Sequence, residues 1–435
     1  MSELVAARSL MALSLGFHII FAIVGMILPL LVALAHYKFL RTDDLEYQKI
    51  SKWWMRGLGI FFATGAVSGT ALSFELGLLW PTFMLHAGPI FGMPFSWEGT
   101  AFFLEAIFLG LYLFGEKRLS PWVHWRTGIG VGACGVLSGV FVVAANAWMN
   151  SPAGFDWING KAENIDPVAA MFNDAWFSQA QHTLVSAMLA VGLVVIGVHA
   201  WLWLRGSAPR LNQKAIVLVL PWTIAAALLT PVSGDFSAKD VARRQPLKLA
   251  ALEAHFETTT YAPLVLGGIP NLETKNVEYA IKIPGLLSLM AFNDPSEKVQ
   301  GLNDFPRENW PPVVIVHLAF QVMVGIGSLL AMLALLQLIH RLRFKKYALT
   351  PIALKIMVLL APLGFVAVEA GWVVTEVGRQ PWIIYEILRT KDSLTLMPGL
   401  PSIFTIFLVL YLFLGVMVIW LMRRQFQAFA LKETA

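Results

Sequence analysis

The sequence has almost no cysteine and little charge. Its single cysteine, Cys134, excludes an intrachain disulfide, a zinc site built from thiolates and a C-x-x-C-H attachment for haem. Only 14% of the 435 residues are charged, against roughly 25% in an ordinary soluble domain, which argues against a water-soluble enzyme. Hydrophobic residues make up 57% of the chain, too many for a disordered protein. The composition instead indicates a protein that lies in a lipid bilayer.

Long apolar runs recur along the whole chain, and each is long enough to cross a bilayer as a helix. The first run, from about Ser9, is too long for the apolar region of a cleaved signal peptide, so we expect it to remain as a membrane helix. The sequence predicts an all-α integral membrane protein with nine transmembrane helices. The predicted spans are 9–36, 53–80, 97–115, 127–147, 176–204, 215–233, 312–339, 351–374 and 399–421.

Lysine and arginine are concentrated in alternate connections between these spans. Positively charged short loops resist translocation, so we expect the basic side to be cytoplasmic, with the N-terminus outside and the C-terminus inside. The net charge of +5 is therefore a signal of orientation and not of nucleic-acid binding. The basic connections are 37–52, 116–126, 205–214, 340–350 and the tail after 421.

We expect one membrane domain over residues 1–435, without low-complexity tracts or a clear repeat. Segment 1–147 would hold helices 1–4, segment 176–374 helices 5–8, and segment 399–421 helix 9. Within the second segment, residues 234–311 form the longest polar stretch, which we expect outside the membrane and folded only against the bundle.

Several ionisable side chains fall within or next to the predicted spans, where they are costly and therefore candidates for function. A histidine near a helix end is often only an interfacial residue bonded to a carbonyl or to water. That interpretation is as good as a functional one for His199 and His317, and weaker for His18 and His182, which lie well inside their spans. The candidates are His18, Glu75, Glu98, Glu105, His182, His199, His317, Glu369 and Glu376.

Imidazoles, thioethers and buried carboxylates suit haem iron better than zinc or calcium. Most of the 16 methionines are packing residues. Met323 differs in context, because Gly325 and Gly327 in the run FQVMVGIG leave room for a flat macrocycle.

Glu98 and Glu105 lie seven residues apart, so both carboxylates share one helix face, about 10 Å apart along the axis. Two carboxylates on one face of a membrane helix favour a proton relay. The alternative is a pair bonded to neighbouring hydroxyls.

The stretch 369–382 reads EAGWVVTEVGRQPW. Glu376 and Arg379 are three residues apart and would face each other on a helix, flanked by Trp372 and Trp382. This pattern favours a pocket for a planar anionic cofactor, since an arginine fork can pair with propionates. The alternative is an interfacial Trp/Arg anchor.

Four runs together carry a family resemblance: GRQPW (378–382), EGTAFFLE (98–105), KLAALEAHFET (248–258) and NAWMNSP (146–152). With the nine-span layout, they make nearly the whole chain resemble subunit I of the cytochrome bd-type quinol oxidases. The resemblance implies two four-helix bundles plus one peripheral helix. It also implies a respiratory terminal oxidase that oxidises quinol at the outer face, reduces O2 to water with protons from the cytoplasm, and has no dedicated proton pump.

The resemblance also implies site residues. His182 and Met323 correspond to the axial ligands of a low-spin haem b. His18 and Glu376 correspond to ligands of two high-spin haems, a haem b and either a haem d or a third haem b. Arg379 would neutralise nearby charge. In the loop outside the membrane, called the Q-loop in this family, Lys248 and Glu253 correspond to the quinol site. The residues that correspond to the proton route are Glu98, Glu105 and, less directly, Ser138 and Asn146.

Two departures from the family are visible. Gln321 stands two residues before Met323, where many members carry arginine, so the potential of the low-spin haem is expected to differ. Segment 259–311 lacks a long insertion, which makes this a short-loop type. The implied partners are subunit II, a single-helix small subunit in some members, membrane quinol and O2, with no nucleic acid, in a bacterial inner membrane. Ubiquinol and menaquinol are both compatible with the residues, as is cyanide tolerance.

Two other functions compete with this one. The first is a bis-histidine cytochrome b that passes electrons from quinol to another acceptor, encouraged by His317 at a depth close to that of His182. It would leave Glu98, Glu105 and Glu376 without roles. The second is a transporter whose buried carboxylates bind substrate or coupling ions, and it predicts a colourless protein.

Overall fold

The computed structural model describes residues 1–434, with side chains through residue 427, so most of the predicted basic tail lies outside the described side chains. Within this part of the chain, nine helical segments are long and apolar enough to cross a membrane, which confirms the predicted number. They are α1 (Glu3–Thr42), α2 (Leu45–Leu79), α3 (Pro81–Phe114), α4 (Pro121–Asn150), α6 (Trp176–Leu204), α7 (Pro209–Arg244), α10 (Val313–Phe344), α11 with α12 (Pro351–Leu360 and Leu363–Val377) and α13 (Leu400–Thr434).

Local sequence signals set several helix ends. Ser2 caps α1 by accepting a hydrogen bond of 3.3 Å from the Val5 N–H. Asp43 ends the same helix in the left-handed region, at φ 53°, and Asp44 then caps α2 through a 3.0 Å bond from the Glu46 N–H. Proline occupies the first turn of α3, α4, α7 and α11, where its missing N–H has no helical partner to lose.

Several predicted connections are partly or wholly helical in the structure, including most of 37–52. The segment 81–96, expected as a loop, is the first half of α3, which starts at Pro81 directly after Trp80 and continues through Pro89 and Pro94. The segment 234–244, expected outside the membrane, completes α7. Polar residues at its end, such as Asp240 and Arg244, pair with each other at i and i+4 and so stay helical.

The connections carry short elements. Residues 245–312, here called the long loop, contain two antiparallel strand pairs, β3 with β6 and β4 with β5. Two further hairpins, β1–β2 and β7–β8, lie in other connections. The short elements are β1 (Asp156–Ile158), β2 (Lys161–Glu163), α5 (Pro167–Met171), α8 (Pro246–Leu252), β3 (Leu264–Leu266), β4 (Ile269–Asn271), β5 (Asn276–Glu278), β6 (Ile281–Ile283), α9 (Leu286–Phe292), η1 (Leu302–Asp304), η2 (Arg307–Asn309), β7 (Trp382–Ile384), β8 (Leu388–Arg389) and η3 (Thr390–Ser393).

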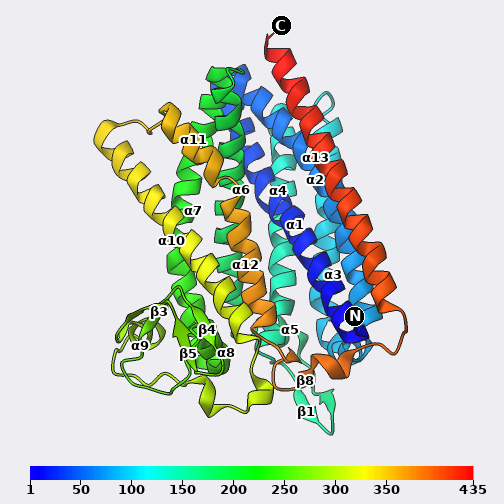
Figure 1. Ribbon diagram of the computed structural model, residues 1–435. Coiled ribbons are helices and arrows are strands. Elements are labelled where there is room, and N and C mark those ends of the chain that lie inside the picture. The colour runs from blue at the N-terminus through cyan, green and yellow to red at the C-terminus, as the bar shows by residue number, and fades with distance from the viewer. Residues whose placement is uncertain (435) are drawn as a thin grey trace.

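The helices pack in two groups. Helices α1 to α4 contact one another, as do α6, α7, α10 and α12, while α13 lies along α1 and α2 (Figure 1). In α1 61% of the apolar window is buried, but in α10 and α13 only 11% is, so these two present apolar faces outward. The N-terminus and the long loop share one end of the bundle, called the loop end below, and the C-terminus lies at the opposite end (Figure 1).

Candidate functional site

His182 on α6 is held by α7. Its Nδ1 lies 2.8 Å from the hydroxyl of Ser233, which itself donates to the Thr230 carbonyl. A hydroxyl already donating to a carbonyl accepts from the imidazole, so Nδ1 carries the proton and Nε2 keeps its lone pair. The next residue, Gly234, comes so close that a Cβ there would lie 3.5 Å from the ring. Ser233 therefore fixes both the tautomer and the orientation of the ring.

His18 on α1 has the same kind of support from α2. Its Nδ1 lies 3.0 Å from the Ser68 hydroxyl, and a Cβ on the following Gly69 would meet the ring at 2.8 Å. Since real Cβ atoms are not found so close, only glycine lets α1 approach α2 at this point. His18 and His182 are thus each held by a Ser-Gly pair on the next helix.

A third Ser-Gly pair supports a carboxylate. Ser138, followed by Gly139 on α4, donates a 3.0 Å hydrogen bond to Glu98 on α3. Glu105, two turns along the same helix, is enclosed between α1 and α4, and a Cβ on Gly135 would lie 3.4 Å from its Oε1. Both carboxylates therefore lie on the face of α3 that the seven-residue spacing predicts.

Met323 on α10 faces α12. A Cβ on Gly371 would lie 3.1 Å from its sulfur, whereas Cβ atoms on Gly325 and Gly327 would meet nothing within 4 Å. Helices α10 and α6, which carry Met323 and His182, both pack against α7 and α12. The two predicted ligands thus project from the same four-helix group.

A chain of hydrogen bonds joins the long loop to the end of α12. Lys248 donates to Asn150 at 3.0 Å, and Asn150 donates to Asn146 at 3.1 Å. Asn146 in turn donates to one oxygen of Glu376, and Arg379 donates to the other oxygen at 2.6 Å. Four residues singled out in the sequence are therefore connected, and Asn150 is the link that sequence reasoning missed.

Burial dominates the electrostatics of the predicted quinol residues. Lys248 is 4% exposed, and burial followed by repulsion from Arg379 lowers the pKa of its amine to about 7. Glu253 is 2% exposed, and burial raises the pKa of its carboxyl to about 8, opposed by the backbone N–H of Val265. Both groups can therefore change protonation near neutral pH.

The histidines near the helix ends are hydrogen-bonded within the protein, His199 through both ring nitrogens and His317 through Nδ1. His199 accepts from the Trp54 indole at 2.9 Å and donates to the Asn212 side chain at 2.7 Å. His317 lies 2.8 Å from the Leu252 carbonyl through Nδ1 and 3.3 Å from the Gly267 carbonyl through Nε2. These contacts agree with the interpretation that such histidines are satisfied within the protein.

Two further predicted carboxylates lie elsewhere in the bundle. Glu75 on α2 accepts a 2.7 Å hydrogen bond from Ser14 on α1. Glu369 on α12 faces α1, where a Cβ on Gly16 would lie 3.3 Å from its Oε2. Neither belongs to the chain that links Lys248 to Arg379.

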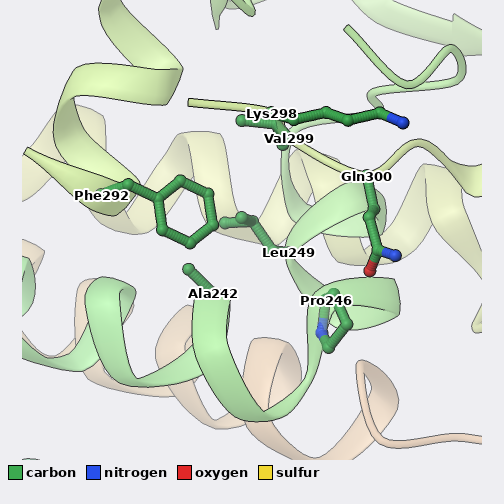
Figure 2. Close-up of a pocket in the computed structure, with 7 residues that line it drawn as sticks. All are labelled: Ala242, Pro246, Leu249, Phe292, Lys298, Val299 and Gln300. Atoms are coloured by element: carbon green, nitrogen blue, oxygen red, sulfur yellow. The ribbon is translucent and has the colours of Figure 1, made fainter. Parts of the chain in front are cut away.

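A cavity of about 260 Å³ lies inside the long loop, between α8 and α9 (Figure 2). Phe292, Leu249 and Ala242 make one side apolar, and the amide of Gln300 lies near Pro246 on the other side. This volume is just below the usual range for ligand pockets. Lys248 is bonded to Asn150 and does not line the cavity, so the cavity and the chain of hydrogen bonds are separate features.

The sequence is similar over nearly its whole length to one known family. Residues 6–429 match the model of the family described as cytochrome bd terminal oxidase subunit I. The chain belongs to this family. Its membership implies a haem-containing quinol oxidase subunit that works with a second subunit in respiratory electron transport, and a multi-pass membrane protein.

Individual relatives agree with this assignment. The chain is 36% identical to a putative cytochrome bd menaquinol oxidase subunit I of Bacillus subtilis, covering 100% of this chain and 98% of the relative. It is 28% identical to the cytochrome bd-II ubiquinol oxidase subunit 1 of Escherichia coli, covering 88% of each. The structure of the bd oxidase from Geobacillus thermodenitrificans superposes with a TM-score of 0.92 at 36% identity, covering 98% of both chains.

Proposed function

We propose that this subunit carries the haems of a terminal oxidase in a bacterial inner membrane, which oxidises ubiquinol or menaquinol and reduces O2 to water. It would form a membrane heterodimer with subunit II, to which a single-helix small subunit can be added. The whole of residues 1–435 would act as one membrane domain, with the long loop outside and the C-terminus in the cytoplasm, as the distribution of basic loops favours.

The observation that carries this proposal is the chain of hydrogen bonds from Lys248 through Asn150 and Asn146 to Glu376 and Arg379. It joins the candidate quinol residue of the long loop to the candidate haem residues of α12. Burying the Arg379 guanidinium and the Lys248 amine, which are 2% and 4% exposed, is costly unless their charges are used or compensated. Such a chain is unexpected in a protein without redox or proton chemistry at this position.

Several features of the chain fit haem. Ser233 holds Nδ1 of His182 as a second ligand shell would, so that Nε2 can face iron. Among the described residues, no three His, Cys, Asp or Glu side chains cluster as a bare metal ion would need, which suits a metal that brings four ring nitrogens of its own. Haem iron, when bound, would supply electron transfer where His182 and Met323 would hold it, and dioxygen chemistry where His18 or Glu376 would hold it.

The surroundings of Arg379 suit the anionic propionate groups of a haem. Its side chain is 2% exposed, and its Nε and Nη1 have no hydrogen-bond partner within the described residues. A guanidinium left with buried donors can pair with a propionate. Trp372, partly buried in the core on α12, offers a flat apolar face. We propose that one of the two high-spin haems binds here, one of the pair being a haem b and the other a haem d or a third haem b.

Protons would be handled by carboxylates on both sides. Glu253 keeps one buried oxygen, Oε2, without a partner in the described chain, so its carboxylate can accept the proton of a quinol hydroxyl. Lys248 would hold the other quinol oxygen. Glu105 and Glu98 would hold protons drawn from the cytoplasmic side, so that charge separates without a dedicated pump.

The test is a pyridine haemochrome analysis of the purified two-subunit complex, with a carbon monoxide difference spectrum and quinol-driven oxygen consumption. We expect three haems, a high-spin signal that shifts with carbon monoxide, and oxygen uptake. Haem without that shift would favour the bis-histidine cytochrome b, although the Gly267 carbonyl lies 3.3 Å from Nε2 of His317, where that function would need iron. A colourless complex would overturn the proposal and favour a transporter.

A further inference from the structure

Gln321 on α10 binds the backbone of the long loop with both atoms of its amide. Its Nε2 donates to the Val265 carbonyl at 2.9 Å, and its Oε1 accepts from the Gly267 N–H at 2.9 Å. Val265 is the middle residue of β3, and Gly267 follows that strand at a φ of +67°. The side chain thus completes the hydrogen bonding of a strand end, as a neighbouring strand would.

His317 lies one turn earlier on the same face of α10 and is fully buried. Its Nδ1 donates to the Leu252 carbonyl at 2.8 Å, and its Nε2 lies 3.3 Å from the Gly267 carbonyl. Leu252 is the last residue of α8. One helix face therefore holds both the end of α8 and the turn after β3.

The two backbone segments that α10 holds, at Leu252 and at the end of β3, both lie next to Glu253. Leu252 precedes it in the chain, and the backbone N–H of Val265 reaches its carboxyl. We infer that His317 and Gln321 are positioning residues of the quinol site, which clamp α8 and β3 onto α10 and so hold the Glu253 carboxyl in place. This inference rests on the proposed role of Glu253 in quinol oxidation.

The two contacts that Gln321 makes with the long loop require an amide side chain. Glutamine offers a donor and an acceptor together, as Val265 and Gly267 require. Arginine, which resemblance leads one to expect at this position, has no acceptor and could not bind the Gly267 N–H. Gln321 therefore has a role in this chain that arginine would not fill.

The test compares Gln321→Leu with Gln337→Leu in the complete two-subunit enzyme. Gln337 is a matched control, because its amide makes the same two-sided contact with the backbone of Ala348 at the other end of α10, at 3.2 Å for each bond. In Gln321→Leu we expect KM for quinol to rise about tenfold with kcat changed less than about twofold. We also expect trypsin to cleave at the exposed Lys275 and Lys282 about tenfold faster. The low-spin haem spectrum should stay unchanged.

Gln337→Leu should match the wild type in all three measurements. The inference is wrong if Gln321→Leu behaves like Gln337→Leu, if cleavage accelerates while KM stays the same, or if only kcat falls. Should Gln321→Leu fail to assemble, Gln321→Glu keeps the acceptor for Gly267 and loses the donor for Val265. It should then raise KM by a smaller factor, and an unchanged KM would again refute the clamp. A wild-type enzyme that oxidises no quinol refutes the proposed function instead.

Discussion

In the described part of the chain, buried polar groups lack a hydrogen-bond partner more often at the loop end of the bundle than at the opposite end. At the opposite end, His199 is bonded to both Trp54 and Asn212, and the Tyr112 hydroxyl is paired with His36 at 2.9 Å. In the half nearer the long loop, several buried atoms have no partner within the described residues. They are Glu75 Oε2, Gln245 Nε2, Glu253 Oε2, His255 Nε2, Glu369 Oε1, Tyr411 Oη and two guanidinium nitrogens of Arg379. At the opposite end, the Ser207 hydroxyl also has no partner in the described chain.

An unpaired buried polar group costs about 1–3 kcal/mol, so a chain does not accumulate such groups without a reason. A bound cofactor or substrate that uses these atoms would remove the cost. A structural histidine therefore differs from a candidate ligand in whether other residues occupy both of its ring nitrogens, and not only in its depth in the bundle. His182 and His199 lie on the same helix and differ in this respect.

We expect the largest effect when His182 is replaced, and comparison with a His199 variant tests the difference between the two. His182→Leu removes the one imidazole on α6 whose Nε2 is not engaged by the chain, so we expect the low-spin haem signal to disappear from the reduced-minus-oxidised spectrum. Met323→Leu should do the same. His199→Leu should keep the signal, because its two ring nitrogens already serve Trp54 and Asn212. The opposite pattern, with the signal lost only in His199→Leu, would contradict the comparison.

The sequence distinguished these two histidines only by their depth, since His182 lies well inside its predicted span and His199 lies near the end. Apolar runs predict the spans because burial of such a run in the bilayer depends only on its composition and length. The nine helices could therefore be predicted. What differs between His182 and His199 is supplied by other helices: Ser233 faces one, while Trp54 and Asn212 face the other. Contacts of this kind depend on the packing of helices and leave no local periodic signal.

One sequence signal was nevertheless present. The Ser-Gly pairs at 68–69, 138–139 and 233–234 each lie on the second helix of a hairpin and hold an ionisable side chain of the first. They form a repeat that a search for longer similarity misses, since only two residues recur. Serine supplies the hydrogen bond, and glycine allows the close approach of the helices at His18.

A second prediction concerns the unpaired carboxylate of the long loop. Glu253→Gln removes the proton acceptor but keeps the shape, so kcat/KM for quinol should fall about a hundredfold, within the usual range for general-base catalysis. Glu257→Gln is the control, because that carboxylate is exposed and bonded to Asn303. Equal losses in the two variants, measured as quinol oxidation under saturating oxygen, would show that the unpaired oxygen of Glu253 has no special role.

A third prediction follows from the pKa of Glu253, which burial raises to about 8. The deprotonated form accepts the proton, so kcat/KM for quinol should rise with pH up to about 8 and fall about tenfold for each unit below it. Lys248, with a pKa lowered to about 7, still has N–H donors after it loses its charge and should not cancel this rise. A pH profile that keeps its slope in Glu253→Gln would assign the titration to another group.

The smallest effect is expected at the end of the bundle where polar groups are paired. Asn212→Leu leaves the Nδ1 hydrogen of the fully buried His199 without an acceptor, which should lower the free energy of unfolding by about 1–3 kcal/mol. Asn212→Asp keeps an acceptor and should cost less. Because this region only stabilises the fold, the midpoint of thermal denaturation should fall while the haem spectrum and the KM for quinol stay constant. If Asn212→Leu shifted the spectrum without lowering the midpoint, the pairing at this end would serve the haems as well, and the contrast between the two ends would fail.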